Sequence, residues 1–175
     1  MMRIEPLDPA RHDRVGFTSG VAQVDNYLRK TANKLAQAGN LRVFVMTNMS
    51  GDLIGYYALN AHAVDYRDLP PRFGRTRPGH GQIPTAFIAM IGVDARFQGK
   101  GYGGDLLVDA LKRVWRAGRD LGIAVVMLDI LDCGNPSQVE RRRMLYMRYG
   151  FEALPTQPDR LFLPLATLES LLATH

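Results

Sequence analysis

Four glycines placed close together after an apolar stretch could hold a phosphate group. The apolar residues run from Ala86 to Val93, and an amphipathic pattern begins directly after the glycines. Glycine permits the dihedrals that turn several backbone N–H groups toward one point, and a helix N-terminus attracts an anion. A buried strand that leads through a glycine loop into a helix therefore predicts a phosphate-binding site. The glycines are Gly99, Gly101, Gly103 and Gly104.

The glycine loop departs from two common nucleotide-binding patterns. A Walker A loop ends in Gly-Lys-Ser or Gly-Lys-Thr, and this loop has no such ending. The dinucleotide pattern has Gly or Ala three residues after its second glycine, where this chain has Leu106 after Gly103. That pattern also expects the first strand of a repeated unit, whereas this loop follows the fourth predicted strand. We therefore expect a phosphate-bearing ligand of another kind.

The segments around the loop predict an alternation of strands and helices. A strand is expected at 2–7, and apolar residues spaced by three or four positions from Val21 predict a helix that ends at Gly39-Asn40. Residues 65–83 are rich in proline, arginine and glycine and predict a long loop. Further strands are expected at 41–49, 53–64, 85–93, 123–131 and as a pair within 151–165, and further helices at 103–120, 135–150 and 167–173. This order predicts an α/β (α+β) fold with a mixed sheet and helices on both faces. The helix at 103–120 is expected to bury Leu107, Ala110, Leu111, Val114 and Leu121.

The composition is typical of one globular domain. The chain has 175 residues, and we expect a single domain over residues 1–175. Charges stand near the N-terminus where a signal peptide needs an apolar run, and no run is long enough to span a bilayer, so we expect a cytoplasmic protein without a membrane partner. Cys133 is the only cysteine and the histidines lack ligand spacing, so no metal site is expected.

The charge balance of the chain is basic. The formal net charge is +5 and the sequence pI is about 9.6. This balance suits a polyanionic partner such as nucleic acid, and it equally suits a small protein that is simply kept in solution. Charge alone leaves both interpretations open.

Two patterns in this order resemble the GNAT family of N-acetyltransferases. Gln98, Gly101 and Gly103 match its Gln-x-x-Gly-x-Gly acyl-coenzyme A signature, directly after a strand. Residues 145–151, Leu-Tyr-Met-Arg-Tyr-Gly-Phe, resemble the family's Phe-Tyr-x-x-x-Gly-Phe segment on its last long helix. One strand separates the two patterns here as in the family, and the resemblance covers most of the chain. It implies a GNAT fold, with a mostly antiparallel central sheet and a splayed pair of parallel strands.

The resemblance implies an acyltransferase that uses acetyl-CoA and transfers acetyl to a primary amine by direct attack. Backbone N–H groups of the glycine loop would hold the pyrophosphate, and the strand around Ile91 and Val93 would bond the pantetheine amides and the acetyl carbonyl. The expected residues of the coenzyme A site are Ile91, Val93, Gln98, Gly99, Lys100, Gly101, Tyr102, Gly103, Gly104 and Asn135.

The segment before residue 145 departs from the family pattern. Many members carry Asn seven residues and Ala four residues before the tyrosine, where this chain has Val139 and Arg142. The usual Asn contact with pantetheine is therefore absent from its place. Asn135 or Ser137 could supply it instead.

Tyr146 occupies the tyrosine position of the second pattern, and the resemblance implies that it protonates the departing thiolate. A phenol with a reference pKa of about 10 holds its proton at neutral pH and can donate it. The alternative is a helix aromatic that only packs against the sheet. Tyr149 is expected in the core, and Cys133 is expected to be a small buried residue rather than a part of the site.

The strand before the glycine loop lacks a general base. Residues 85–93 contain no Asp or Glu, and Asp94 stands at the edge of the loop. A lysine acceptor, with a reference pKa of about 10.4, would need such a base. An α-amine has a reference pKa of about 8, and esterification of its carboxyl group lowers this pKa further. The sequence therefore favours an acceptor such as the α-amine of aminoacyl-tRNA.

Residues 17–20 and 24–28 also resemble the N-terminal pattern of GNAT toxins from bacterial toxin–antitoxin pairs. That resemblance implies acetylation of charged tRNA, a block of translation, a small antitoxin that binds DNA, and often a homodimer. The arginines just before Tyr146 could instead form a solvated helix face or bind phosphates of coenzyme A. The candidate tRNA contacts are Arg29, Lys30 and Lys34 in the first helix, Arg72, Arg75 and Arg77 in the long loop, and Arg141, Arg142 and Arg143.

Two other functions are compatible with the same residues. One is a GNAT enzyme that acetylates a small amine, a peptide N-terminus or a protein lysine, with no toxin role. The other is a non-catalytic coenzyme A-binding or regulatory protein. The tyrosine at position 146 argues against the second, and the lack of a helix-turn-helix pattern argues against DNA binding by the chain alone.

Overall fold

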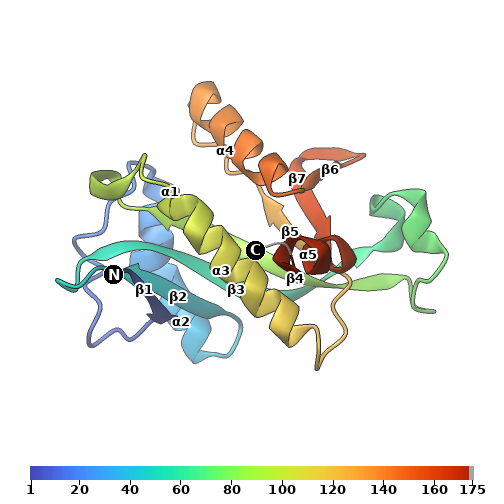
Figure 1. Cartoon of the computed structure of the whole chain (residues 1–175), viewed down its shortest axis with the longest axis horizontal. Coiled ribbons are helices and arrows are strands. Elements are labelled where there is room, and N and C mark those ends of the chain that lie inside the picture. Colours follow the sequence, from blue (N-terminus) through green and yellow to red (C-terminus); the bar gives the residue numbers. More distant parts are fainter. Residues whose placement is uncertain (174–175) are drawn as a thin grey trace. The chain divides into compact units, whose positions relative to one another are not determined.

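The computed structural model describes residues 1–173 (Figure 1). These residues divide into two compact units. The first unit comprises Met1–Asn60 and Ile88–Ala110, and the second comprises Ala61–Phe87 and, among the described residues, 111–173. Strands β3 and β4 and helix α3 each begin in one unit and end in the other. The single domain expected over residues 1–175 stays a prediction.

Within residues 1–173, seven strands are hydrogen-bonded in the order β1-β2-β3-β4-β5-β7-β6. The pairs β1/β2, β2/β3, β5/β7 and β6/β7 are antiparallel. Strands β4 and β5 are neighbours joined through α3, which is the crossover connection that parallel strands need. The predicted mixed, mostly antiparallel sheet is confirmed. The strands are β1 (Arg3–Pro6), β2 (Arg42–Thr47), β3 (Leu53–Asp65), β4 (Gln82–Val93), β5 (Val125–Asp129), β6 (Glu152–Leu154) and β7 (Gln157–Pro164).

The first predicted helix forms in three pieces. Helix α1 (Ala22–Asn26) is followed by a π-helical segment (Tyr27–Thr31) and by α2 (Ala32–Gln37). Val24, Leu28 and Ala32 are completely buried, as their spacing predicts, because they form one apolar stripe. The π-helical segment was not predicted, because apolar residues spaced by three or four positions do not distinguish one wider π-helical turn from an α-helical turn.

Two glycines bring β3, β4 and α1 into close contact in the first unit. A Cβ atom at Gly92 would lie 2.3 Å from Cγ1 of Val24, and a Cβ atom at Gly55 would lie 2.7 Å from the carbonyl oxygen of Gly92. Any larger side chain at either place would push these elements apart. The sequence analysis singled out neither residue, although both help to set the end of β4 from which the glycine loop starts.

The second unit contains most of the remaining elements. Residues Val125 to Leu128 of β5 are buried on both faces, as the continuous apolar run predicts. The predicted long loop contains two short 3-10 turns, Tyr66–Asp68 and Pro71–Gly74, and Leu69 between them is buried in the same hydrophobic cluster as Val125. Helices α4 (Pro136–Arg148) and α5 (Leu165–Ala173) complete this unit.

Helix α3 (Tyr102–Ala117) ends earlier than the predicted boundary at residue 120. Its apolar residues Leu107, Ala110, Leu111 and Val114 are buried as expected. Leu121 lies beyond the helix and is 66% exposed, so its predicted burial is wrong. No helix among residues 1–173 combines the length and the apolar character needed to cross a bilayer.

Candidate active site

The glycine loop after β4 keeps its backbone N–H groups unbonded. Gly99 and Gly101 have φ angles of 78° and 88°, and no described atom lies within 4 Å of where their Cβ atoms would stand. Within residues 1–173, the backbone N–H groups from Gln98 to Gly101 donate no hydrogen bond. The first N–H groups of α3 have no partner in the helix either, because of helix geometry. These open donors at a helix N-terminus suit the pyrophosphate of coenzyme A, so the residues present fit this ligand.

Asp94 fixes the start of this loop from a fully buried position. Its carboxylate accepts hydrogen bonds from the backbone N–H groups of Thr18 (3.1 Å) and Arg96 (2.9 Å), and it forms an ion pair with the Arg96 guanidinium (3.0 Å). Burial disfavours the charged carboxylate, but the hydrogen bonds from Arg96 and Thr18 outweigh it and hold the pKa of Asp94 below its usual range. Asp94 is therefore an ionised anchor whose oxygens are already bonded, and it is unsuited to act as a general base.

Gln98 uses its side chain to hold the loop from within. Its amide Nε2 donates to the carbonyl oxygens of Ser19 (2.8 Å) and Val93 (2.9 Å). A part for Gln98 in coenzyme A binding is thus left to its backbone N–H. The carbonyl oxygen of Val93 is also occupied, so only the other backbone groups around Ile91 and Val93 remain for pantetheine. Both residues are half-buried.

The segment before α1 is held against the loop by a second buried acid. Asp25 accepts hydrogen bonds from the backbone N–H and the hydroxyl of Ser19, each at 2.7 Å. The backbone N–H of Ala95 donates to the carbonyl of Thr18 at 2.7 Å. The sequence analysis missed Asp25 and Asp94 as positioning residues. An acid directly beside the apolar stripe, as Asp25 stands beside Val24, was the signal that could have identified one of them.

Tyr146 lies on α4 in the second unit and is 5% exposed. Its ring packs edge-on against Phe151 at 6.2 Å between centroids. Within residues 1–173 its hydroxyl makes no hydrogen bond, and it is not among the fully enclosed polar atoms. Burial raises the pKa of Tyr146 to about 12, and the nearby positive charge of Arg142 opposes this rise in part. The hydroxyl is therefore protonated at neutral pH and free to donate.

The end of α4 is fixed immediately after this tyrosine. The N–H of Phe151 donates to the carbonyl of Tyr146 at 3.3 Å, and Gly150 has a φ of 97°, which favours glycine over any other residue. The Gly-Phe part of the sequence pattern is thus a helix stop that fixes the backbone around Tyr146. Tyr149 is partly exposed, so its predicted place in the core is wrong.

The start of α4 is fixed by Asn135. Its side-chain oxygen accepts from the backbone N–H groups of Ser137 (3.1 Å) and Gln138 (3.3 Å), as an N-cap does. Its predicted contact with pantetheine is left to the amide nitrogen. Cys133 is half-exposed, with Sγ 3.5 Å from Oε1 of Gln138, so the expectation of a buried cysteine is wrong.

The arginine triplet of α4 divides into different roles. Arg143 donates to the carbonyl of Pro158 (2.8 Å) and forms ion pairs with Asp159 (2.5 Å) and Glu140 (3.5 Å). It braces the start of β7, which makes it a poor candidate for tRNA binding. Arg141 and Arg142 form no hydrogen bond or ion pair within residues 1–173 and remain candidates.

The other candidate cations divide in the same way. Arg72 pairs with Glu152 at 3.2 Å, and Arg77 donates to the carbonyl of Gly74 and stacks on the Tyr66 ring. Arg29 donates to the carbonyl of Phe17. Among residues 1–173, no hydrogen bond or ion pair engages the side chains of the three remaining candidates, which are Lys30, Lys34 and Arg75.

Comparisons with known proteins place the chain among bacterial toxins. It is 58% identical over 170 residues to the "Probable toxin TacT" of Sinorhizobium fredii (strain NBRC 101917 / NGR234), covering 97% of this chain and 94% of the relative. It is 33% identical over 151 residues to the "tRNA-acetylating toxin" of Mycobacterium tuberculosis (strain ATCC 25618 / H37Rv), covering 86% and 85%. The chain belongs to the GNAT toxin family. No protein-family model matches it.

Solved structures of GNAT toxins share its fold. AtaT complexed with acetyl-methionyl-tRNAfMet superposes with a TM-score of 0.84 at 23% identity, covering 98% of this chain and 99% of that one. A mutant AtaT toxin bound to the C-terminus of the antitoxin AtaR and to acetyl-CoA gives a TM-score of 0.79 at 22% identity, with 99% of both chains covered. The predicted GNAT fold is confirmed by these likenesses.

Proposed function

We infer that this protein is an acetyl-CoA-dependent N-acetyltransferase whose acceptor is the α-amine of aminoacyl-tRNA, and that it acts as a translation-blocking toxin. The observation that carries this inference is the identity, over most of both chains, to a relative named as a tRNA-acetylating toxin. The side chains of this chain support each step.

The glycine loop would bind the diphosphate part of acetyl-CoA through its open N–H groups. Asp94 and Gln98 hold this loop in place before the ligand arrives, which lowers the entropy cost of binding. When bound, acetyl-CoA supplies the acetyl group as a thioester. The half-buried backbone at Ile91 and Val93 would orient it through main-chain hydrogen bonds.

Tyr146 would act as the general acid. A pKa of about 12 keeps the proton on its hydroxyl at neutral pH, and the absence of a protein partner among residues 1–173 leaves that proton available for the leaving sulfur. The same high pKa prevents Tyr146 from serving as the base at neutral pH.

The acceptor amine would arrive largely deprotonated. Residues 85–93 contain no carboxylate, and the one at Asp94 is consumed by Thr18 and Arg96. An esterified α-amine ionises at lower pH than a lysine side chain and needs less help from a base. This chemistry supports aminoacyl-tRNA over a protein lysine.

The partners follow from the same inference. We propose that the chain works in the cytoplasm, where charged tRNA is found, that a small antitoxin neutralises it, and that it forms a homodimer. The proposed tRNA contacts are the candidate cations whose side chains form no hydrogen bond or ion pair among residues 1–173. They are Lys30, Lys34, Arg75, Arg141 and Arg142.

The test is transfer of labelled acetyl groups from acetyl-CoA to total charged tRNA. We expect label in the RNA fraction with the wild-type protein and almost none with Tyr146→Phe. Mild base, which hydrolyses the aminoacyl ester, should release the label as an N-acetyl amino acid. Label that appears only on small amines or on protein lysines would overturn the aminoacyl-tRNA assignment, and coenzyme A binding without turnover on any amine would overturn the enzyme assignment.

A further inference from the structure

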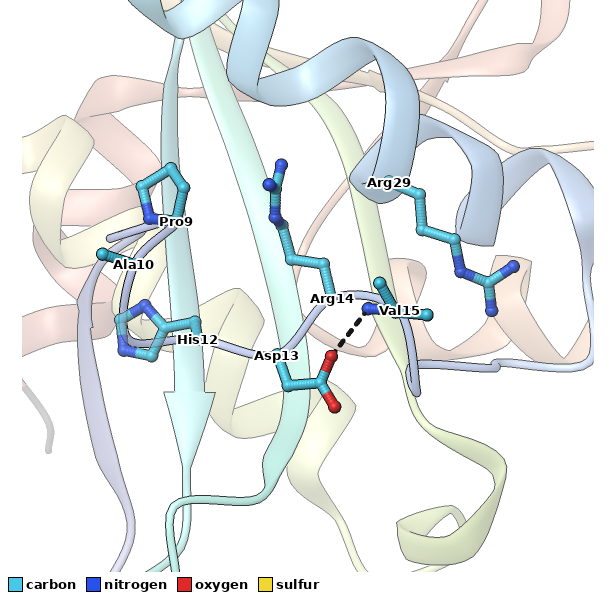
Figure 2. Close-up of a pocket in the computed structure, with 7 residues that line it drawn as sticks. All are labelled: Pro9, Ala10, His12, Asp13, Arg14, Val15 and Arg29. Carbon is cyan, nitrogen blue, oxygen red and sulfur yellow. Dashed lines mark hydrogen bonds between the residues drawn. The ribbon is translucent and has the colours of Figure 1, made fainter.

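A pocket in the first unit lies outside the glycine loop and contains unneutralised positive charge. It has a volume of about 310 Å³ and is lined by Pro9, Ala10, residues 12–15 and Arg29 (Figure 2). The segment 9–15 precedes α1, and Arg29 comes from the π-helical segment. The sequence analysis assigned no role to the residues of this segment.

Arg14 is the residue of the pocket that lacks a partner. Its side chain is half-buried, and within residues 1–173 its guanidinium forms no hydrogen bond and no ion pair. A guanidinium loses hydration when it is partly buried, and this loss is normally offset by an acidic or carbonyl partner. An external anion in the pocket would supply that partner.

Arg29 adds a second positive charge to the wall of the pocket. Its guanidinium donates to the carbonyl of Phe17, which holds the side chain in place. A carbonyl group is neutral, so this hydrogen bond leaves the positive charge uncompensated and leaves other N–H groups for a ligand. The π-helical segment thus presents a cation whose position is already fixed.

The other polar groups of the pocket do not cancel these charges. Asp13 Oδ1 accepts a hydrogen bond from the backbone N–H of Val15 at 3.0 Å (Figure 2). It also accepts from the backbone N–H of Gly16 at 3.4 Å and so caps that turn. His12 accepts from the N–H of Asp8 at Nδ1 (2.9 Å), while its Nε2 faces Glu5 at 3.0 Å. One carboxylate thus stands against two guanidinium groups, and the pocket carries net positive charge.

Further cations continue from the pocket along the helix. Lys30 directly follows Arg29, and Lys34 stands four residues later. Both are exposed, and their side chains form no hydrogen bond or ion pair within residues 1–173. A single carboxylate ligand would need only the pocket. Several separate charges suit a polymer that carries many anions, which is the character of a nucleic-acid backbone.

We propose that the pocket lined by Pro9, Ala10, residues 12–15 and Arg29 is a subsite for a backbone phosphate of the tRNA substrate. Arg14 binds the phosphate oxygens. Arg29, whose guanidinium points away from that of Arg14 (Figure 2), continues the contact to the rest of the strand together with Lys30 and Lys34. The subsite positions the RNA and does not read its sequence, because phosphates are the same at every base. This inference rests on the proposed function, since it assumes that tRNA is the substrate.

Arg14→Gln tests the proposal, with Arg11→Gln as the matched control. Arg11 lies in the same segment, but its guanidinium already pairs with Glu5 at 2.8 Å. Both changes are made in a Tyr146→Phe background, so that binding is measured without turnover. We expect Arg14→Gln to weaken binding of total tRNA about 3- to 10-fold and to reduce the slope of log K against log salt by about 1. Arg11→Gln should change neither quantity by more than about twofold.

Further measurements keep the result specific. Affinity for acetyl-CoA and the thermal midpoint should be unchanged in Arg14→Gln, because the guanidinium of Arg14 makes no hydrogen bond or ion pair within the described residues. Combining Arg14→Gln with Lys34→Gln should reduce the salt slope further. An unchanged tRNA affinity and slope would overturn the proposal. Weaker binding of polyglutamate with unchanged tRNA binding would overturn it too, in favour of an acidic protein segment. Failure of acetyl transfer by the wild type would overturn the proposed function alone, because tRNA binding is measured independently.

Discussion

The glycine loop offers backbone groups to a ligand, whereas helix α4 offers side chains. In the loop, the side chains of Asp94 and Gln98 are turned inward and bonded to the protein, and the backbone N–H groups from Gln98 to Gly101 are left open among the described residues. In α4 the backbone is bonded within the helix, and the side chains of Tyr146 and Arg142 form no hydrogen bond or ion pair among residues 1–173.

Because of this difference, the two regions respond to different kinds of substitution. The loop depends on backbone conformation, so its acids and amides act as supports that a ligand never needs to touch. The helix depends on the identity of one side chain, since no backbone group can replace the acidic hydroxyl of Tyr146. Substitutions can therefore separate the residues that hold the loop in place from the residue that transfers the proton.

Tyr146→Phe should slow acetyl transfer without weakening acetyl-CoA binding or the fold. The variant loses only the hydroxyl, whose proton is available at neutral pH, and we expect kcat for acetyl transfer to fall about a hundredfold to ten-thousandfold. The dissociation constant for acetyl-CoA and the unfolding midpoint should remain close to wild type. Steady-state kinetics and calorimetric titration measure both. A kcat within threefold of wild type would show that Tyr146 is only a packing residue.

Asp94→Asn should destabilise the fold around the glycine loop without removing the general acid. The buried carboxylate accepts charge-assisted hydrogen bonds, and their loss should lower the free energy of unfolding by about 1.5–3 kcal/mol. The pH dependence gives a second readout. Because the pKa of Asp94 is lowered in the fold, its contribution is present above the unfolded pKa of about 3.9 and is lost as the pH falls through the folded pKa. Urea denaturation between pH 3 and pH 7 should show the wild-type advantage shrinking at the acidic end. An advantage that stays constant with pH would contradict an ionised anchor.

Gln98→Ala should weaken the loop more mildly. The side chain makes two hydrogen bonds to carbonyl groups, each contributing about 0.5–1.5 kcal/mol. We expect KM for acetyl-CoA to rise about 2- to 10-fold, with kcat changed by less than about threefold, because Tyr146 is untouched. The control is Gln138→Ala at the start of α4, which should leave KM unchanged. Loss of kcat at constant KM would place the Gln98 side chain in the chemistry instead.

The smallest effect concerns the ionisation of Tyr146. Burial raises its pKa to about 12, so the neutral phenol stabilises the fold below about pH 10, and this contribution is lost as the pH rises from 10 through 12. The difference in ultraviolet absorbance between wild type and Tyr146→Phe should show no phenolate signal below about pH 10. A phenolate signal that appears near pH 9 would mean that the hydroxyl is solvated in the fold.

The sequence predicted the elements and the chemistry of the site better than the partners of its charges. Apolar periodicity identified the helices and strands because burial imposes it directly, and it failed at Leu121 because the helix ends four residues earlier, at Ala117. Arg143 and Arg142 are adjacent and look alike in sequence. Only the position of Asp159, on another element, makes one a brace and leaves the other without a partner among the described residues.

By itself, the sequence determined that a glycine loop follows a buried strand, that a tyrosine follows on a later helix, and that the family is the GNAT toxins. These features are local, since they depend on residue type and spacing along one element. The tertiary structure decided which groups are consumed and which remain open. Asp94 became an anchor and Gln98 a brace because Thr18 and Ser19, far away in the chain, lie within hydrogen-bond distance of them. Arg14 was left without a partner, among residues 1–173, for the same physical reason: pairing depends on distance in space, which spacing along the chain does not contain.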